Sequence, residues 1–130
     1  MSFRPWPKKQ FVKNATPTEV NGHAFPSKLE AAVYNFLLKR EYLAEITDIK
    51  MQQTVVLQGG SRETRITWRL DFSFIRRIDG ELVYVEAKGF QTDVYKLKLK
   101  LFMFNPPADL EVYGGSHTRF SLTHKIKKGG

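Results

Sequence analysis

The chain has 130 residues and a formal net charge of +8, from 21 Lys and Arg against 13 Asp and Glu. This length fits one domain, and a hydrophobic fraction of 42% excludes a wholly disordered chain. Cysteine is absent, which excludes disulfides and thiolate metal sites and favours an intracellular location. No apolar run is long enough for a transmembrane helix, and the N-terminus lacks a signal peptide's apolar stretch. The positive charge indicates a polyanionic partner.

A single domain with three regions is expected. Residues 1–20 are predicted to be irregular, because prolines interrupt any long element. This region is interpreted either as a surface arm held by Trp6 and Phe11 or as a basic arm that follows a phosphate backbone. The core is expected over residues 21–113. Residues 114–130 are expected to form a basic tail that is frayed at its end.

The first helix is predicted to begin after Ser27 and to end near residues 39–41. Ser27 is a favourable N-cap, and Glu30 lies at the N3 position of a capping box. Apolar residues then recur at helical spacing, which predicts one buried face formed by Leu29, Val33, Phe36, Leu37 and Leu43.

Strands follow this helix. Residues 46–57 indicate one or two strands, and a long strand is predicted over residues 64–75. Asp79-Gly80 is a strong hairpin signal that connects the long strand to another strand over residues 81–88.

Residues 92–104 fit either a strand or a helix. Alternation of Lys and Leu over residues 96–101 is typical of a strand, whereas Thr92 would cap a helix. A strand is predicted next, at residues 110–113, and a helix between two strands would form a right-handed parallel crossover. We therefore predict a helix, and with it an α/β fold. Its apolar stripe would contain Val94, Leu97, Leu101 and Phe104.

Two acidic residues lie inside apolar strands. Asp71 and Glu86 flank the Asp79-Gly80 turn at similar distances, so their carboxylates are expected to be roughly level. Neighbouring strands are about 4.8 Å apart, which allows both carboxylates to reach one ion if they share a face. Two adjacent carboxylates resist ionisation unless a cation lies between them. Oxygen ligands favour Mg²⁺ or Mn²⁺.

Lys88 follows Glu86 by two residues, so both side chains are expected on one face of the strand. A lysine beside a carboxylate–metal site can orient a water and stabilise negative charge on a phosphate. The alternative is an ordinary ion pair of Asp71, Glu86 and Lys88 on an exposed sheet face. The spacing alone leaves both interpretations open.

These residues resemble a known signature. Leu70-Asp71-Phe72 followed by Val85-Glu86-Ala87-Lys88-Gly89 resembles the PD-(D/E)XK nuclease superfamily, although Leu70 stands where the name-giving pattern has proline. Ser27-Lys28-Leu29-Glu30 resembles the helix of its Holliday-junction resolvase branch. Residues 21–31, with the later Met51-Gln52-Gln53, look similar to a small phage-encoded family of that superfamily. The likeness covers residues 21–113 and leaves open whether Gln52 or Gln53 lies at the site's edge.

The resemblance implies a mixed central sheet flanked by helices, with a restriction-endonuclease-like core. It also implies metal-dependent hydrolysis of DNA phosphodiester bonds, on branched or otherwise structured DNA. In that case Mg²⁺ or Mn²⁺ would be held by Glu30, Asp71, Glu86 and the backbone carbonyl of Ala87. Lys88 would hold the attacking water. No P-loop motif is present, so no nucleotide cofactor is expected.

Basic residues near these motifs are expected to contact DNA phosphates. Lys96 and Lys100 would share one helix face. Binding of this kind is largely independent of sequence and sensitive to salt. For any single lysine, a solvated surface position is the alternative. The candidate DNA contacts are Lys28, Arg69, Lys96, Lys98 and Lys100.

A junction resolvase makes two coordinated cuts, so a homodimer is expected, with Phe102 and Phe104 as candidate apolar surface. Two alternatives remain for function: a nuclease subunit that is active only within a complex, and a non-catalytic DNA-binding module on the same fold. No membrane partner is expected. The location would be the host cytoplasm if the protein is phage-encoded.

Overall fold

The computed structural model describes residues 18–130. Its helices are α1 (Lys28–Tyr42) and α2 (Asp93–Phe104). Its strands are β1 (Thr18–Val20), β2 (His23–Phe25), β3 (Ile46–Gln58), β4 (Ile66–Arg76), β5 (Leu82–Ala87), β6 (Asp109–Ser116) and β7 (Arg119–Ile126). Most of the expected N-terminal arm, residues 1–17, lies outside the described residues.

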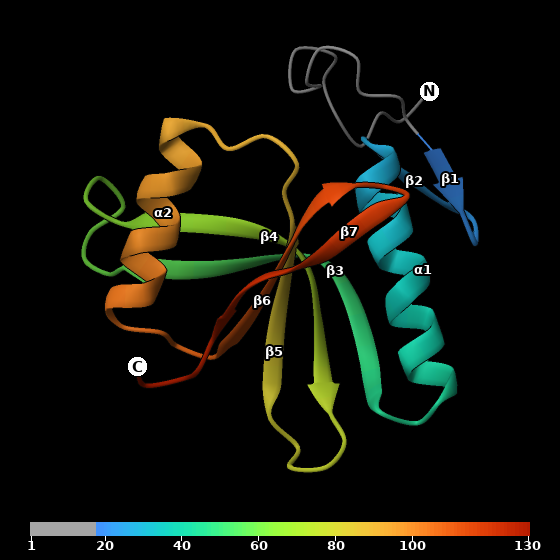
Figure 1. The fold of residues 1–130 in the computed structure, drawn as a ribbon. Coiled ribbons are helices and arrows are strands. Elements are labelled where there is room, and N and C mark those ends of the chain that lie inside the picture. The colour runs from blue at the N-terminus through green and yellow to red at the C-terminus, as the bar shows by residue number, and fades with distance from the viewer. Residues whose placement is uncertain (1–17) are drawn as a thin grey trace, which may run out of the picture.

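One mixed sheet of five strands forms the centre of the protein, in the order β3-β4-β5-β6-β7 (Figure 1). Only β5 and β6 pair in parallel, and α2 connects them as the predicted crossover. A small antiparallel pair of β1 and β2 precedes α1. The predicted α/β class is therefore confirmed. Within residues 18–130, neither helix is long and apolar enough to cross a membrane.

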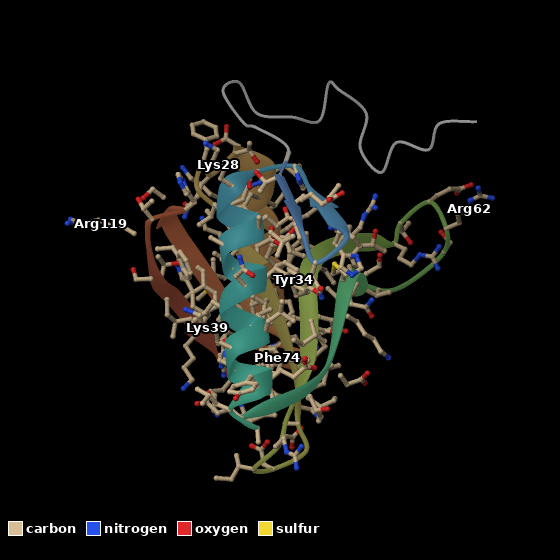
Figure 2. All side chains as sticks on the ribbon, turned by 90° about the vertical axis from the view of Figure 1, so that its right-hand side faces the viewer. Lys28, Tyr34, Lys39, Arg62, Phe74 and Arg119 are labelled. Atoms are coloured by element: carbon tan, nitrogen blue, oxygen red, sulfur yellow. The ribbon has the colours of Figure 1, made fainter. Side chains whose placement is uncertain are left out.

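Helix α1 begins as its capping signal predicts. The Ser27 hydroxyl accepts a hydrogen bond from the backbone N–H of Glu30 at 3.1 Å. Leu29, Val33 and Leu37 are buried against the sheet, which α1 covers in Figure 2. Leu43 was predicted to join this buried face, but it follows the end of the helix and is 64% exposed. The apolar spacing in the sequence continues to Leu43, but α1 ends at Tyr42.

Helix α2 buries a different face from the one predicted. Thr92 caps it by accepting a hydrogen bond from the N–H of Tyr95 at 3.1 Å. The predicted stripe faces solvent instead, with Val94 62%, Leu97 58% and Phe104 90% exposed.

The buried residues of α2 are Tyr95, Leu99 and Phe102. Phe102 is fully buried, so its expected place on the surface is wrong. Trp68 explains the choice of face, because its ring meets Tyr95 edge-on at 5.7 Å and Phe102 at 6.0 Å. The helix carries two apolar stripes, and the aromatic one packs against the sheet.

The segment predicted to be a basic tail forms the end of the sheet. Residues 114–116 complete β6, and residues 119–126 form β7, which pairs antiparallel with β6. Phe120 of β7 packs edge-on against Tyr113 with a centroid distance of 6.1 Å. The N–H of Lys128 donates to Asp109 Oδ1 at 2.8 Å, so the expected fraying of this end is wrong.

Strand β4 contributes to two hydrophobic clusters. Trp68 and Leu70 pack with α2, whereas Phe72 and Phe74 pack with α1. Alternate residues of a flat strand face one side, so β4 must twist between Leu70 and Phe72. Figure 1 shows the first half of β4 swung away from β5 toward α2. Asp71 lies at this twist.

Candidate functional site

The candidate site lies where β4 and β5 separate. Their paired positions end at Phe72 and Val85, which makes Asp71 and Glu86 level, as the hairpin predicted. Glu86 Oε1 accepts a hydrogen bond from the N–H of Asp71 at 3.2 Å. Asp71 Oδ2 accepts one from the N–H of Ala87 at 2.9 Å. The two carboxylates thus take the place of backbone partners at the point where the strands diverge.

Glu30 reaches this site from the first turn of α1. Its side chain is buried, and Oε2 has no hydrogen-bond partner within the described part of the chain. Its carboxyl group lies near that of Asp71, because each of the two groups shifts the pKa of the other. The structure therefore brings together three acidic residues from α1, β4 and β5: Asp71 and Glu86, as the hairpin predicted, and Glu30, as the resemblance implied.

Burial and mutual repulsion oppose ionisation of these carboxyls. Burial is the main cause that raises the pKa of Glu30 to about 9, and the charge of Asp71 adds to it. Burial likewise raises the pKa of Asp71, although hydrogen bonds from Glu86 and the Ala87 N–H act to lower it. The pKa of Glu86 is raised by burial and then by Asp71. In the absence of a cation the site therefore retains protons at neutral pH.

Lys88 supplies the positive charge of the site. Its backbone N–H donates to the carbonyl of Tyr113 at 2.9 Å, which extends the pairing with β6 by one residue past the end of β5. Its ammonium charge lowers the pKa values of Glu30, Asp71 and Glu86, so it lies near all three. An exposed, isolated ion pair does not describe this arrangement, because the two glutamates are buried.

Tyr95 is a site neighbour that the sequence did not indicate. The Lys88 Nζ lies 5.4 Å from the centroid of its ring. Burial raises the pKa of its hydroxyl to about 12, with further contributions from the charges of Glu86 and Asp71. No motif marks Tyr95, because the predicted face of α2 excluded it. Its ring comes to the site only through the packing of α2.

The donor set suits a hard divalent cation. Across residues 18–130, no three His, Asp or Glu side chains are already arranged as ligands around one point. Carboxyl oxygens of Glu86 and Asp71 instead accept hydrogen bonds from backbone N–H groups. The candidate side-chain ligands are all carboxyl oxygens, which Mg²⁺ and Mn²⁺ prefer. Among the described residues, Glu30 Oε2 has no hydrogen-bond partner. A cation here would relieve the repulsion that keeps the carboxyls protonated.

The two candidate glutamines differ in their surroundings. Gln52 lies across from Asp71, between the pairs Met51–Phe72 and Gln53–Leu70. Its backbone has a φ of 56°, a strained conformation for a residue other than glycine. The Gln53 side chain donates its amide N–H to the carbonyl of Met51 at 2.9 Å, on its own strand. Gln52 is therefore the glutamine at the level of the acidic cluster.

Comparison with known proteins gives a family. Residues 11–127 match a family model described as "Protein of unknown function (DUF1064)". The chain belongs to this family. No curated protein matches it. Among solved structures, this DUF1064 chain is similar to one titled "Crystal structure of SSO0001", with a TM-score of 0.44 and 11% identity. That alignment covers 77% of this chain and 50% of the other, so the chain spans half of that protein's length.

The basic residues predicted to contact DNA lie on three elements of this DUF1064 protein. Lys28 begins α1, two residues before Glu30, and is exposed at that end of the helix in Figure 2. Arg69 is exposed on β4, two residues before Asp71. On α2, Lys96 and Lys100 are exposed and Lys98 is half-buried. The predicted DNA contacts thus lie on α1 and β4, which carry Glu30 and Asp71, and on α2, which carries Tyr95.

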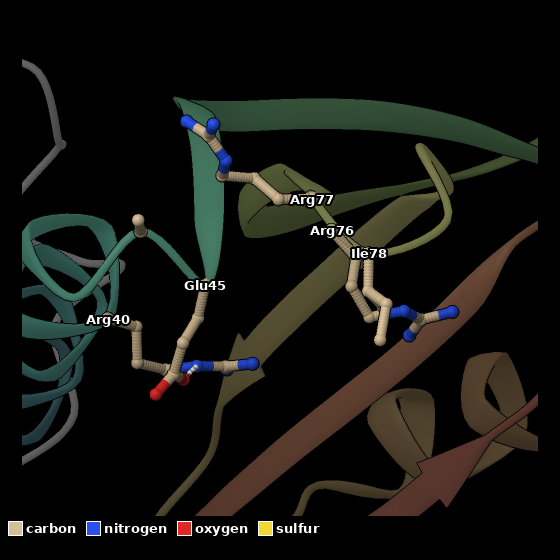
Figure 3. Close-up of a pocket in the computed structure, with 6 residues that line it drawn as sticks. Arg40, Glu45, Arg76, Arg77 and Ile78 are labelled. Atoms are coloured by element: carbon tan, nitrogen blue, oxygen red, sulfur yellow. Dashed lines mark ion pairs between the residues drawn. The ribbon is translucent and has the colours of Figure 1, made fainter.

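A separate hollow of about 460 Å³ lies at the other end of α1 (Figure 3). Arg40, Arg76 and Arg77 line it. Arg40 lies ten residues beyond Glu30, or about 15 Å along the helix. It pairs with Glu111 at 2.9 Å, and Arg76 pairs with Asp109 at 2.8 Å. Two of its arginines are therefore neutralised by carboxylates, and the hollow is not part of the acidic site.

Proposed function

We propose that this DUF1064 protein is a Mg²⁺- or Mn²⁺-dependent DNA endonuclease with a restriction-endonuclease-like core. The observation that carries the proposal is the buried cluster of Glu30, Asp71 and Glu86 with Lys88 beside it. A binding module gains no affinity for phosphates from clustered acids. The mixed sheet flanked by two helices is the arrangement that the resemblance to PD-(D/E)XK nucleases implies.

Each residue of the cluster has a role in this proposal. Glu30, Asp71, Glu86 and the carbonyl of Ala87 would hold the cation. When bound, the cation supplies charge neutralisation at the scissile phosphate and lowers the pKa of a water. Lys88 orients the attacking water and stabilises negative charge on the phosphate. Because the acids lie on α1, β4 and β5 within one core, their positions are fixed before substrate binds.

The substrate proposed is branched or otherwise structured DNA, cut in a resolvase-like or nicking reaction. Lys28, Arg69, Lys96, Lys98 and Lys100 would contact its phosphates. A homodimer would place two sites on one junction. The exposed apolar side chains of α2 offer surface for such contact, and sedimentation equilibrium at two ionic strengths measures the assembly state.

The proposal is tested by cleavage of labelled single-stranded, duplex, flap and four-way-junction DNA with EDTA, Mg²⁺ or Mn²⁺. We expect metal-dependent cutting by the wild-type protein and none by Asp71→Asn, because the central cation ligand is lost. DNA affinity should stay equal or increase, since one negative charge near the phosphates is removed. The substrate that is cut fastest then identifies the physiological DNA structure.

Asp48→Asn is the matched control. Asp48 is an exposed acid on β3 with a φ of 59°, a conformation that Asn adopts readily. It should cut like wild type. Tight DNA binding without cutting under either metal would contradict a stand-alone nuclease. Cutting restored by a partner protein would then favour the complex-dependent subunit, and its continued absence would favour the binding module.

A further inference from the structure

Tyr95 combines two features that a packing role does not require. The residue is only 4% exposed, and its hydroxyl has no hydrogen-bond partner among residues 18–130. A buried hydroxyl without a partner destabilises a folded protein relative to a phenylalanine of the same shape. The ring alone would satisfy the contact with Trp68 at 5.7 Å. Stability of the core therefore does not explain the presence of the hydroxyl.

The ring of Tyr95 also lies beside Lys88, the lysine whose charge acts on all three carboxyls. The Lys88 Nζ lies 5.4 Å from the ring centroid, within the range in which a cation is attracted to an aromatic face. Lys88 has a flexible side chain of four carbons that carries a strongly hydrated charge. An aromatic face beside it restricts where the ammonium group can lie. The same residue therefore borders both the lysine and the acidic cluster.

We propose that Tyr95 is a positioning residue of this site: its ring holds the Lys88 ammonium beside the carboxylates, and its hydroxyl is a hydrogen-bond donor for Glu86 when that carboxylate ligates a cation. The inference rests on the proposed function. Glu86 is the carboxylate chosen because it precedes Lys88 by two residues, and the Lys88 Nζ lies 5.4 Å from the Tyr95 ring; the charge of Glu86 also acts on the hydroxyl. Ligand-orienting donors of this kind typically change metal affinity by about ten- to a hundredfold.

The two roles are separated by two variants. Tyr95→Phe keeps the ring and removes the hydroxyl, and Tyr95→Leu removes both. Calorimetric titration with Mn²⁺ in the absence of DNA measures cation affinity directly. We expect Tyr95→Phe to bind Mn²⁺ about tenfold more weakly than wild type. The metal-free variant should melt at the same temperature or higher, because a buried unpartnered hydroxyl has been removed.

Tyr113→Phe is the matched control. The Tyr113 hydroxyl is buried too, but it donates to Glu111 Oε1 at 2.9 Å. Its removal should lower the melting temperature and leave Mn²⁺ affinity unchanged. If Tyr95→Phe behaves in this way as well, its hydroxyl is structural and its proposed role is wrong.

The ring's role has its own spectroscopic signature. Protons on the Lys88 side chain above the Tyr95 ring should resonate upfield through the ring current, and Lys88→Arg identifies their signals. The shift should persist in Tyr95→Phe and vanish in Tyr95→Leu. A shift that is absent from wild type overturns the ring's role whether or not the protein cuts DNA. Failure of wild type to bind either cation would overturn the proposed function together with the hydroxyl's role, while the ring-current result stands separately.

Discussion

Burial disfavours the charged form of Glu30. Its carboxyl is buried, one oxygen has no hydrogen-bond partner among residues 18–130, and its pKa rises from 4.5 to about 9. A carboxyl whose pKa is higher in the folded than in the unfolded state favours folding when it is protonated. That contribution is complete below pH 4.5 and is lost as the pH rises toward about 9.

We therefore expect the metal-free protein to lose stability between about pH 5 and pH 9, as this raised pKa dictates. Glu30→Gln should weaken this dependence and raise the melting temperature at pH 8, because the amide cannot ionise. Thermal denaturation monitored by circular dichroism across this range measures both effects. Glu41→Gln, an exposed residue of the same helix, is the control and should follow wild type. An unchanged pH profile in Glu30→Gln would contradict the assignment.

Asp71 and Glu86 could be predicted to lie level from a local signal, whereas Glu30 was assigned to the site through the resemblance and only its place in the helix has a local signal. The capping box places Glu30 in the first turn of α1, and the Asp79-Gly80 turn sets Asp71 level with Glu86. Tyr95 could not be predicted in this way. Its place beside Lys88 depends on which face of α2 packs against Trp68, and that is decided by contacts distant in sequence.

At the level of elements, α2 has a double character. One face packs on the sheet, and the other exposes Val94, Leu97 and Phe104. Lys96 and Lys100 lie one turn apart on the exposed surface between these faces. The helix begins five residues after Lys88, and under the proposed function both lysines would contact the phosphates of a bound strand.

Removal of both lysines should change the salt dependence of DNA binding. In Lys96→Gln/Lys100→Gln, the slope of log affinity against log salt concentration should fall in magnitude by about 2, one for each lost phosphate contact. Fluorescence anisotropy over a salt series measures this slope. Lys39→Gln/Lys50→Gln makes the same change in net charge at exposed positions elsewhere and should leave the slope near that of wild type. Equal effects from both pairs would indicate a general effect of charge.

The errors at this level have physical causes. The periodicity of α2 allows two apolar stripes, and only the aromatic partners on β4 select between them. Strand β7 was missed because an arginine, a histidine and a lysine lie among its apolar residues. Phe120, Leu122 and Ile126 nevertheless alternate with polar residues, which is the pattern of an edge strand with one covered face.

Across the whole molecule, Asp109 joins parts of the chain that are far apart in sequence. It is buried at the start of β6 and pairs with Arg76 at the end of β4 at 2.8 Å. Its other oxygen accepts the N–H of Lys128, beyond β7. Burial acts to raise its pKa, but the hydrogen bonds from Lys128 and Arg76 outweigh burial and lower it.

Asp109→Asn should lower the free energy of unfolding by about 2 kcal/mol or more, because the Arg76 charge loses a buried partner. Urea denaturation measures the change. The lowered pKa means that this stabilisation is present above pH 3.8 and is lost as the pH falls through the pKa of the folded state. Asp79→Asn, at an exposed partner of the same arginine, should have a much smaller effect. Equal losses of unfolding free energy in the two variants would contradict the prediction that the buried pair with Asp109 is the more stabilising one.

Strand β4 has a consequence for how the protein unfolds. Its first half contributes Trp68 and Leu70 to the cluster beneath α2, and its second half contributes Phe72 and Phe74 to the cluster beneath α1. Two clusters of this size on separate strands would be able to melt independently. Here neither can open without distorting the strand that the other needs, and Asp71 lies at the junction. The protein should therefore unfold in one cooperative step, with the acidic site intact until the whole fold is lost.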